Sequence, residues 1–396
     1  MVSYDTIKAL VQEYTADICR MRRHIHENPE LSNEEVQTAA YMAQMLRSFG
    51  IETEEHVAGT HAVLGRLTGG KPGPTIALRT DMDALPITEE TGLSFASNRQ
   101  GIMHACGHDG HMSILLGTAK VLSTLKEELA GTVLFVCQPA EEKSPVGGAK
   151  QLVKSGILDG VQAVYGFHMW PNLPTGKIGV RTGAMMAASD HVRVIIHGKS
   201  SHAAMPHKGI DAVVAAGQFI TAGQDIISRQ INPLYPVVLT FGRISGGTRY
   251  NIVADTVELE GTCRTYDTEA QDMVETSLGN MLKGLDMMYG TTSELQYERG
   301  YAAVVNSPKQ AAFIADTVKS CLGEQSLAEV PEPAMTAEDF SGYLQAYDGG
   351  FYWLGTTKSG QTMYPLHNSH FAVDEASLPI GVEVMVSLAC RALSNE

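Results

Sequence analysis

The sequence predicts an α/β fold into which a smaller ferredoxin-like unit is inserted. Three observations support this prediction. Short apolar runs typical of buried parallel strands alternate with amphipathic helical stretches towards both ends of the chain. In the middle of the chain, the pattern changes to the β-α-β-β-α-β order of a ferredoxin-like unit. A chain of 396 residues also exceeds what one hydrophobic core usually accommodates, so two domains are expected.

Two helices are expected at the start of the chain. Apolar residues recur at helical spacing over residues 7–25, and Asn28-Pro29 ends this helix. Ser32 and Glu35 then have the spacing of a capping box, in which two side chains satisfy amide groups at a helix N-terminus. This motif predicts a second helix that runs to about Gly50.

Four apolar runs are expected to form buried strands of the sheet, and helical stretches separate them. The runs are Ile76–Leu78, Val133–Val136, Val161–Phe167 and Phe351–Leu354. Polar side chains follow three of these runs: Asp81 and Asp83 the first, Glu141-Glu142 the second, and His168 the third. Because ligands bind beyond the carboxyl ends of strands in open α/β sheets, this edge is the expected functional site.

The inserted unit is expected to contain four strands and two helices. In sequence order they are a strand at 192–196, a helix at 210–229, strands at 237–243 and 256–264, a helix at 269–288 and a strand at 294–298. We therefore expect an inserted domain over residues 188–299. The larger domain is expected in two parts, residues 1–187 and 300–396.

Composition limits the partners of the protein. With 29 basic and 44 acidic residues, the formal net charge is −15, which repels nucleic acid and anionic membranes. The N-terminus lacks the basic start and apolar core of a signal peptide, and no apolar run approaches the roughly 20 residues that span a bilayer. The six cysteines form no CxxC pair, which is typical of a reduced, cytoplasmic protein.

Residues 103–112, MHACGHDGHM, concentrate three histidines, a cysteine and an aspartate. Cys106 and His108 lie two positions apart in a glycine-containing loop, so both side chains can point into one cavity. The adjacent carboxylates Glu141 and Glu142 are costly to bury unless a cation or a proton offsets them. Two further candidate ligands come after later strands, His168 and His367. Together these residues indicate a hydrolytic metal site.

Other interpretations remain open from these residues alone. Cys106 could act as a nucleophile with His108 or His104 as its base, although that interpretation leaves the glutamate pair without a role. A non-catalytic metal-binding or regulatory protein is a third candidate. Asp109 and His111 could cap the helix that follows them, which is the interpretation we favour for His111.

The segment MTAEDF contains another acidic pair, Glu338-Asp339. Thr336 and Asp339 have the spacing of a capping box, so we interpret this segment as a helix N-terminus. The pair is therefore expected to lie outside the metal site.

Seven motifs spread over nearly the whole chain resemble those of one enzyme superfamily. They are RRHIHENPELSNEE, LRTDMDALPITEETGLSFAS, MHACGHDGHM, QPAEE, GFHMWP, GKSSHAAMPHKGIDA and LHNSHF. Through them the chain resembles the di-metal amidohydrolases of the aminoacylase and carboxypeptidase superfamily. The closer resemblance is to hippurate hydrolases, indoleacetyl-amino-acid hydrolases and bacterial N-acyl-amino-acid amidohydrolases. It implies a zinc-peptidase-like catalytic domain with a central mixed sheet, and an inserted dimerisation or lid domain.

The resemblance also implies roles in the metal centre. Cys106 would bridge the two metal ions, and the ligand set would be completed by His108, Glu142, His168 and His367. Glu141 would be the general base that activates the attacking water. Asp83 would orient one of the ligands. Two residues earlier, Asp81 replaces the histidine that is usual in other branches, which fits transfer of that ligand role to His108.

For the inserted domain, the resemblance implies that His202 polarises the scissile carbonyl in the neighbouring subunit of a homodimer. Asn251 and Arg264 would bind the carboxylate of the substrate. Strand alternation independently assigns Arg264 to the polar face of its strand and Cys263 to the core.

The implied activity is hydrolysis of an N-acyl-L-amino acid to a carboxylic acid and a free amino acid. The implied cofactor is two divalent metal ions per subunit, zinc or manganese, with cobalt or nickel as further options. The alternative activity is that of a carboxypeptidase or dipeptidase that acts on small peptides. In either case, the expected partner is a small-molecule substrate.

Overall fold

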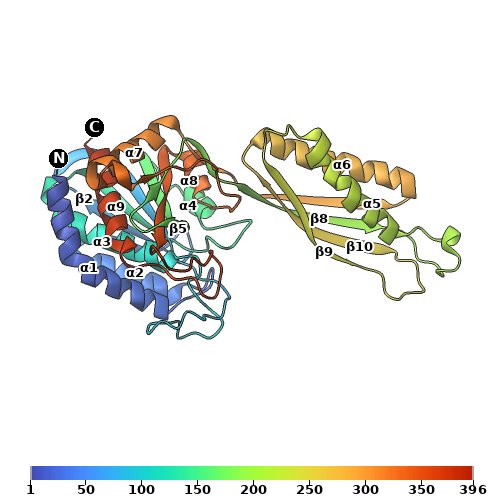
Figure 1. Cartoon of the computed structure of the whole chain (residues 1–396), viewed down its shortest axis with the longest axis horizontal. Coiled ribbons are helices and arrows are strands. Elements are labelled where there is room, and N and C mark those ends of the chain that lie inside the picture. Colours follow the sequence, from blue (N-terminus) through green and yellow to red (C-terminus); the bar gives the residue numbers. More distant parts are fainter. Residues whose placement is uncertain (1, 395–396) are drawn as a thin grey trace. The chain divides into compact units, whose positions relative to one another are not determined.

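The structure is a computed structural model that describes residues 2–394, and these residues form two compact units (Figure 1). The first unit takes in the chain up to Met185, Val304–Pro333 and the chain from Asp339 onward. The second unit takes in Met186–Ala303 and Ala334–Glu338. Each unit has its own cluster of buried apolar side chains. Among residues 2–394, no helix combines the length and the apolar character needed to cross a membrane.

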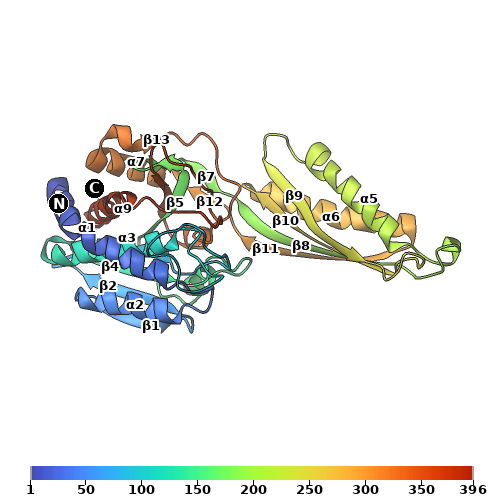
Figure 2. The same ribbon diagram turned by 60° about the horizontal axis from the view of Figure 1, so that its bottom comes forward.

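The first unit is built on an eight-stranded mixed sheet with the strand order β1-β2-β4-β3-β5-β14-β6-β13 (Figure 2). Its bounds are β1 Glu52–Val57, β2 Ala62–Thr68, β3 Lys71–Asp81, β4 Ala130–Gln138, β5 Ala163–Pro174, β6 Ile178–Gly179, β13 Leu327–Ala328 and β14 Gly349–Thr357. The strands β4, β3, β5 and β14 form a parallel centre, which β2 and β6 flank in antiparallel orientation. The four predicted apolar runs fall in this centre, although β5 begins at Ala163, two residues after the predicted start at Val161. The predicted α/β class is confirmed.

Helices α1, α3 and α9 pack against one another and contribute to the large apolar cluster of this unit (Figure 1). The helices of the first unit are α1 Tyr4–Glu27, α2 Val36–Ser48, α3 His108–Thr124, α4 Ala149–Lys154, α7 Pro308–Leu322, α8 Ser341–Ala346 and α9 Ser377–Leu393. Helix α1 begins with a hydrogen bond from the Thr6 amide to the Ser3 side chain at 3.1 Å. Its buried apolar residues include Ile7 and Ile25, as the helical spacing predicts.

The second predicted helix exists, but its predicted capping box is wrong. Helix α2 begins at Val36, and the N-cap residue Glu35 makes no capping hydrogen bond with its side chain. The hydroxyl of Ser32 donates instead to the Asp83 carboxylate at 2.6 Å. The amide of Thr38, near the start of the helix, donates to Glu30 Oε2 at 2.8 Å. The capping-box residues serve distant partners because the chain folds back onto the end of β3, which the local spacing does not reveal.

The second unit has the expected element order, with four antiparallel strands and two helices. Its bounds are β8 Ala188–His197, α5 Ala212–Asp225, β9 Val237–Gly246, β10 Thr256–Thr265, α6 Thr268–Tyr289 and β11 Thr292–Tyr301. The strand order is β11-β8-β10-β9, and every pairing is antiparallel. Apolar residues of both helices pack with those of the sheet in one cluster. A separate two-stranded sheet is formed by β7 Gly183–Met186 and β12 Val304–Asn306.

Candidate metal centre

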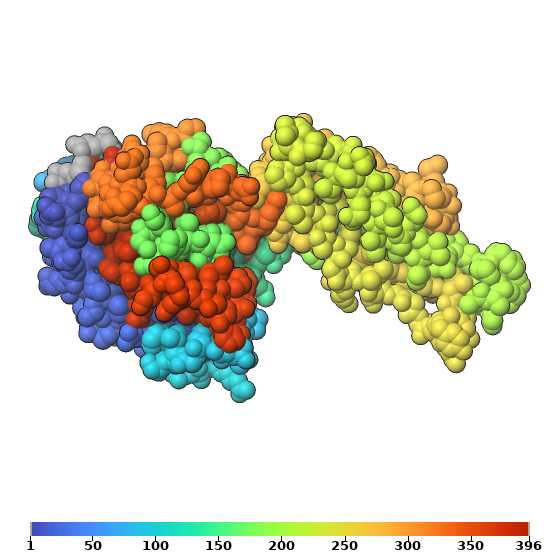
Figure 3. Space-filling model, viewed as in Figure 1, coloured from blue at the N-terminus to red at the C-terminus, as the bar shows by residue number. Residues whose placement is uncertain are grey.

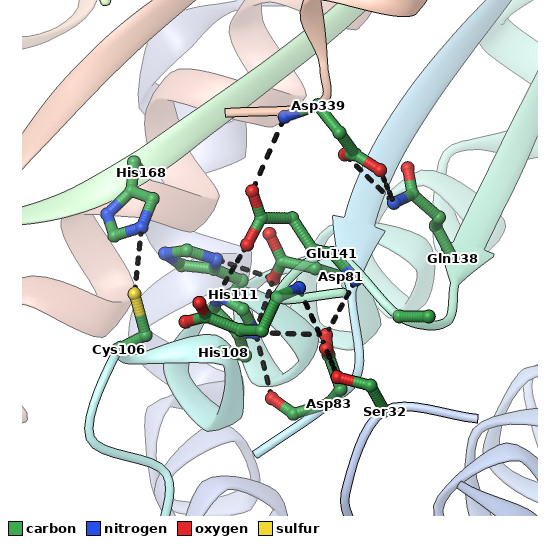
Figure 4. Close-up of polar contacts among 12 residues, drawn as sticks. Ser32, Asp81, Asp83, Cys106, His108, His111, Gln138, Glu141, His168 and Asp339 are labelled. Atoms are coloured by element: carbon green, nitrogen blue, oxygen red, sulfur yellow. Dashed lines mark hydrogen bonds and ion pairs between the residues drawn. The ribbon is translucent and has the colours of Figure 1, made fainter. Parts of the chain in front are cut away.

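Several elements of the first unit bring the predicted ligands together at the carboxyl edge of its sheet. Figure 4 shows three of them, Cys106, His108 and His168. Cys106 and His108 flank Gly107 at the start of α3. Gly107 has a φ of 91°, and a Cβ there would lie 3.2 Å from the Met169 side chain. Glycine therefore permits both the left-handed turn and the close approach of β5 that bring these two predicted ligands together.

The other predicted ligands come from three separate segments. Glu142 follows β4, His168 lies within β5, and His367 lies in the loop after β14. The Sγ atom of Cys106 is 3.3 Å from Nε2 of His168. On the other side, Nε2 of His367 is 3.0 Å from Oε1 of Glu142. The structure thus places all five predicted ligands in one cluster, although they span more than 260 positions of the chain.

Among residues 2–394, five sets of three side chains have ligand atoms that all lie within 4.8 Å of one another, and two of these sets consist only of predicted ligands. The first set is Cys106, His108 and His168, and the second is Cys106, Glu142 and His367. The thiol of Cys106 belongs to both sets. A thiolate shared between two such sets could bridge two neighbouring cations.

The two buried histidines of the cluster have their ring orientation set by the backbone. Nδ1 of His108 donates to the Asp83 carbonyl at 2.8 Å, and Nδ1 of His168 donates to the Met169 carbonyl at 2.7 Å. In the neutral form of each ring, Nε2 is then the unprotonated nitrogen, which a metal ion can bind in place of a proton. Nε2 of His108 is buried and has no hydrogen-bond partner among residues 2–394. A buried, unpaired acceptor is costly, so this atom fits a metal ligand.

The side chain of Asp83 holds Glu141 and Glu142 in place by binding their main-chain amides. Its Oδ1 accepts the Glu141 amide at 3.0 Å, and its Oδ2 accepts the Glu142 amide at 2.9 Å. Its Oδ1 is 3.5 Å from Nδ1 of His108, so its contact with that ligand runs mainly through its carbonyl. Asp83 therefore links the two halves of the cluster.

The ionisable groups of the cluster create an environment that favours a cation. Burial by itself lowers the pKa of His108, but the carboxylates of Asp81 and Asp83 outweigh burial and raise that pKa to about 10. Burial raises the pKa of the Cys106 thiol well above its ordinary value, and Glu142 adds to this effect. A bound divalent ion would relieve both effects, since it stabilises a thiolate and neutralises the carboxylates.

The same environment argues against Cys106 as a nucleophile. Its sulfur lies within hydrogen-bond distance of the His168 ring, whereas both ring nitrogens of His104 and Nε2 of His108 have no hydrogen-bond partner among residues 2–394. Burial raises the pKa of the thiol and, with nearby histidines, lowers the pKa of His168 well below its ordinary value. Transfer of the thiol proton to His168 is therefore unfavourable. Burial also lowers the pKa of His104 to about 3, which makes His104 a weak base.

His111 does not cap helix α3, so our interpretation of it was wrong. Its Nδ1 donates to Asp81 Oδ1 at 2.7 Å, and its Nε2 accepts the Met169 amide at 2.9 Å. Asp81 also accepts Arg79 Nη1 at 2.7 Å. His111 therefore anchors β5 beside the ligand His168. The sequence feature that could have indicated this role is the alternation of the charged residues Arg79, Asp81 and Asp83 at the end of an otherwise apolar strand, because Asp81 then needs a buried partner.

Asp339 is likewise part of the site's support, and the capping box predicted for it is wrong. Helix α8 begins only at Ser341. The buried carboxylate of Asp339 accepts Arg79 Nη2 and Gln138 Nε2, both at 2.7 Å, and the Ala149 amide at 2.9 Å. Its own amide donates to Glu141 Oε1 at 3.3 Å (Figure 4). Asp339 thus connects the carboxylate of the predicted base to the buried end of β3.

Asp109 lies beside the cluster but serves the packing of the helices. Its Oδ2 accepts Arg22 Nε at 2.7 Å and lies 2.8 Å from Nδ1 of His26. All three side chains are buried. This ion cluster joins α1 to the start of α3.

The three predicted substrate-binding residues lie in the second unit, at its two opposite ends. His202 bridges to Ile252, and the Ala203 amide donates to the Asn251 carbonyl at 3.1 Å. His202 and Asn251 therefore lie together beyond the end of β8. Arg264 lies near the other end of β10, and it is half-buried while Cys263 is buried, as the alternation predicts. At about 3.3 Å per residue, β10 separates Arg264 from the His202 loop by roughly 25 Å.

Comparisons with known proteins agree with this geometry. Residues 77–391 match the model of Peptidase family M20/M25/M40. A Geobacillus stearothermophilus protein named N-acyl-L-amino acid amidohydrolase is 43% identical over 302 residues, which cover 76% of this chain and 81% of the relative. Thermostable carboxypeptidase 1 of Saccharolobus solfataricus is 38% identical over 389 residues, which cover 98% of each.

A solved structure extends the similarity to three dimensions. It is the crystal structure of the YXEP protein of Bacillus subtilis, described as a dinuclear metal binding peptidase from the M20 family. Its TM-score to this chain is 0.85 at 33% sequence identity, and the match covers 97% of this chain and 100% of that one. The chain belongs to Peptidase family M20/M25/M40 and is a hydrolase of amide bonds.

Proposed function

We propose that this protein is a metal-dependent amidohydrolase that cleaves N-acyl-L-amino acids to a carboxylic acid and a free amino acid. The observation that carries the proposal is the Cys106 thiol, which belongs to two ligand sets beside the carboxylate of Glu141. The relative named N-acyl-L-amino acid amidohydrolase supports the substrate class. A cytoplasmic location fits the six cysteines, all of which are free.

Two divalent ions would be held by five residues of the first unit, Cys106, His108, Glu142, His168 and His367. When bound, such ions lower the pKa of water towards about 7 and polarise a carbonyl oxygen. Zinc and manganese are the leading candidates, with cobalt or nickel as further options. A thiolate and three imidazoles suit the softer ions of this group, while a carboxylate also accepts manganese.

Glu141 would act as the general base and then as the acid. Its amide is bound by Asp83, and its Oε1 accepts the Asp339 amide at 3.3 Å. These contacts orient the carboxylate towards His108, whose Nε2 lies 4.0 Å from Oε2 of Glu141. Glu141 would take a proton from the attacking water and deliver it to the leaving amine, a role usually worth about 10²–10⁴-fold in rate.

The second unit would act as a dimerisation and lid domain inserted into the catalytic domain. His202 and Asn251 lie at the end of this unit that is remote from its connections at Met186 and Ala303. A small substrate cannot span the roughly 25 Å that separates them from Arg264. Binding by all three residues therefore requires two subunits, with His202 and Asn251 from one and Arg264 from the other.

The surface of the second unit also favours a homodimer. Most of the exposed large apolar side chains of the described chain belong to it, including Val213, Val214, Leu234, Val238, Ile244 and Tyr250. Strand β9 is an edge of its sheet. Figure 3 shows residues of this region, in light green and yellow, on the visible surface of the unit. Exposed apolar side chains and an unpaired strand edge are both typical of a protein interface.

A second candidate activity is that of a carboxypeptidase or dipeptidase. The 38% identity to thermostable carboxypeptidase 1 across 98% of the chain favours it. A peptide differs from an N-acyl amino acid mainly in the free amine next to the acyl carbonyl. The two activities therefore need the same centre and differ in the pocket for the acyl group.

A substrate panel separates the two activities. Acetyl, benzoyl, indoleacetyl and long-chain acyl amino acids are assayed beside dipeptides, after chelation and reloading with Zn²⁺, Mn²⁺, Co²⁺ or Ni²⁺. We expect acyl amino acids to be cleaved with higher kcat/KM than dipeptides, and only after reloading. Preferential cleavage of dipeptides would favour the second candidate, and activity that persists in excess chelator would refute a metal-dependent hydrolase.

A further inference from the structure

The side chain of Glu35 contacts the chain at the residue just before the proposed base. Glu35 is completely buried. Its Oε1 accepts the Ala140 amide at 2.8 Å, over a separation of 105 positions in sequence. Glu35 occupies the N-cap position of α2, yet Glu30 binds the Thr38 amide of that helix in its place. The carboxylate of Glu35 therefore binds the Ala140 amide and makes no capping hydrogen bond to its own helix.

Ala140 has a backbone conformation that needs support. Its φ is 57°, in the left-handed region that residues with a Cβ disfavour. This conformation turns the chain between Gln138, the end of β4, and Glu141. The turn presents the amides of Glu141 and Glu142 to the two oxygens of Asp83. If Ala140 relaxed, both amides would leave Asp83, and both glutamate side chains would move.

We propose that Glu35 is a positioning residue that holds Ala140 in its left-handed conformation and thereby places Glu141 and Glu142. The proposal rests on the proposed function for what these two glutamates do, but its geometry stands on the contacts themselves. Glu35 acts through the length of its side chain and one acceptor oxygen. Its negative charge is not required. Three residues before Glu35, the hydroxyl of Ser32 donates to the Asp83 carboxylate and so also helps to place Asp83.

Three substitutions of Glu35 test separately the length of its side chain, its acceptor oxygen and its negative charge. Glu35→Gln keeps the length and an acceptor oxygen but removes the charge. Glu35→Asp keeps the charge and shortens the side chain. Glu35→Met keeps the length and fills the buried space but lacks the oxygen. Glu34→Gln, at the exposed neighbouring position, is the matched control.

The first measurement is hydrogen exchange of the amides of residues 140–142 in the full-length, metal-loaded protein. Exchange of these amides reports local opening of the turn and does not depend on catalysis. We expect Glu35→Asp and Glu35→Met to exchange at least about tenfold faster there, with α6 unchanged. Glu35→Gln and Glu34→Gln should exchange like the wild type. Unchanged exchange in Glu35→Met, or equally fast exchange in Glu35→Gln, would overturn the proposal.

The second measurement is kinetic. Misplacement of a catalytic group by about 1 Å can cost about 10²-fold in rate. We expect Glu35→Asp and Glu35→Met to lower kcat by about 10–100-fold with KM nearly unchanged. Glu35→Gln should keep the kcat of the wild type. If Glu35→Asp kept its activity and Glu35→Gln lost it, the negative charge of Glu35 would be required, and the proposal would fail. If the wild type cleaves no substrate of the panel, the proposed function fails, and the exchange experiment still decides the role of Glu35.

Discussion

The Sγ atom of Cys106 lies 3.3 Å from Nε2 of His168, and the same thiol also belongs to the ligand set formed with Glu142 and His367. One atom thus joins two halves of the centre that come from different segments of the chain. Of the five predicted ligands, Cys106 is the one that belongs to both sets made up only of predicted ligands. Loss of Cys106 should weaken binding at both halves, whereas loss of a ligand in one set should weaken mainly one half.

The first prediction concerns metal stoichiometry. Cys106→Ser is expected to weaken the binding of both ions by more than the 10–100-fold that loss of a supporting residue typically costs. His367→Ala should weaken one ion and largely retain the other. Metal content after chelator competition measures both effects, with Cys19→Ser as a control for loss of a thiol elsewhere. Two ions bound at wild-type affinity in Cys106→Ser would contradict the shared ligand.

The second prediction concerns the base. Glu141→Gln keeps the size of the side chain but cannot accept a proton from water, so kcat should fall at least about 100-fold. The metal content should stay near that of the wild type, because Glu142 remains. In the matched variant Glu142→Gln, metal content should fall as well. A Glu141→Gln protein with bound metal and near-normal turnover would show that another group is the base.

The third prediction concerns the dimer. His202→Ala and Glu141→Gln homodimers should each be nearly inactive. Removal of a group that stabilises the oxyanion, the role proposed for His202, typically costs about 10²–10³-fold, and Glu141→Gln lacks the proposed base. Co-expression of the two variants should restore activity, since one centre of each mixed dimer keeps both groups. Tandem affinity tags allow the mixed dimers to be isolated and assayed. Isolated mixed dimers with no recovered activity would exclude a site shared between subunits.

The fourth prediction concerns pH. Burial and the nearby Asp83 carboxylate raise the pKa of Glu35 to about 7, from an ordinary value of 4.5. A carboxyl group with a raised folded-state pKa binds more protons in the folded than in the unfolded protein between these values. The free energy of unfolding should therefore fall as pH rises from about 4.5 to 7, by about 3 kcal/mol for this group. Glu35→Gln should not show this loss.

Denaturant unfolding of the metal-free protein at pH 5 and pH 8 tests this expectation. Other groups titrate in the same range, so the informative quantity is the difference in stability between Glu35→Gln and the wild type. We expect this difference to shift in favour of Glu35→Gln at pH 8. An identical difference at both pH values would mean that Glu35 titrates alike in the folded and unfolded chains.

The local pattern of the sequence was sufficient to predict much of the fold. Apolar runs predicted the parallel centre of the sheet because strands buried on both faces need apolar residues at every position. The order of strands and helices in the second unit could be predicted because apolar and polar residues alternate along its strands and its helices have apolar faces. The predicted ligands were chosen by residue type and by motif resemblance, since thiol, imidazole and adjacent carboxylate groups are costly to bury without a cation.

Only the tertiary structure decided which partner each polar side chain has. Ser32, Glu35 and Asp339 all sit at positions where local spacing indicates a helix cap, yet each binds a group far away in the sequence. His111 similarly supports β5 and does not cap its own helix. Local spacing describes only the bonds available within one turn, whereas a buried polar group binds whichever partner the packing of distant segments brings within about 3 Å. The residues that hold the centre in place were therefore decided by long-range packing, which no short stretch of this sequence specifies.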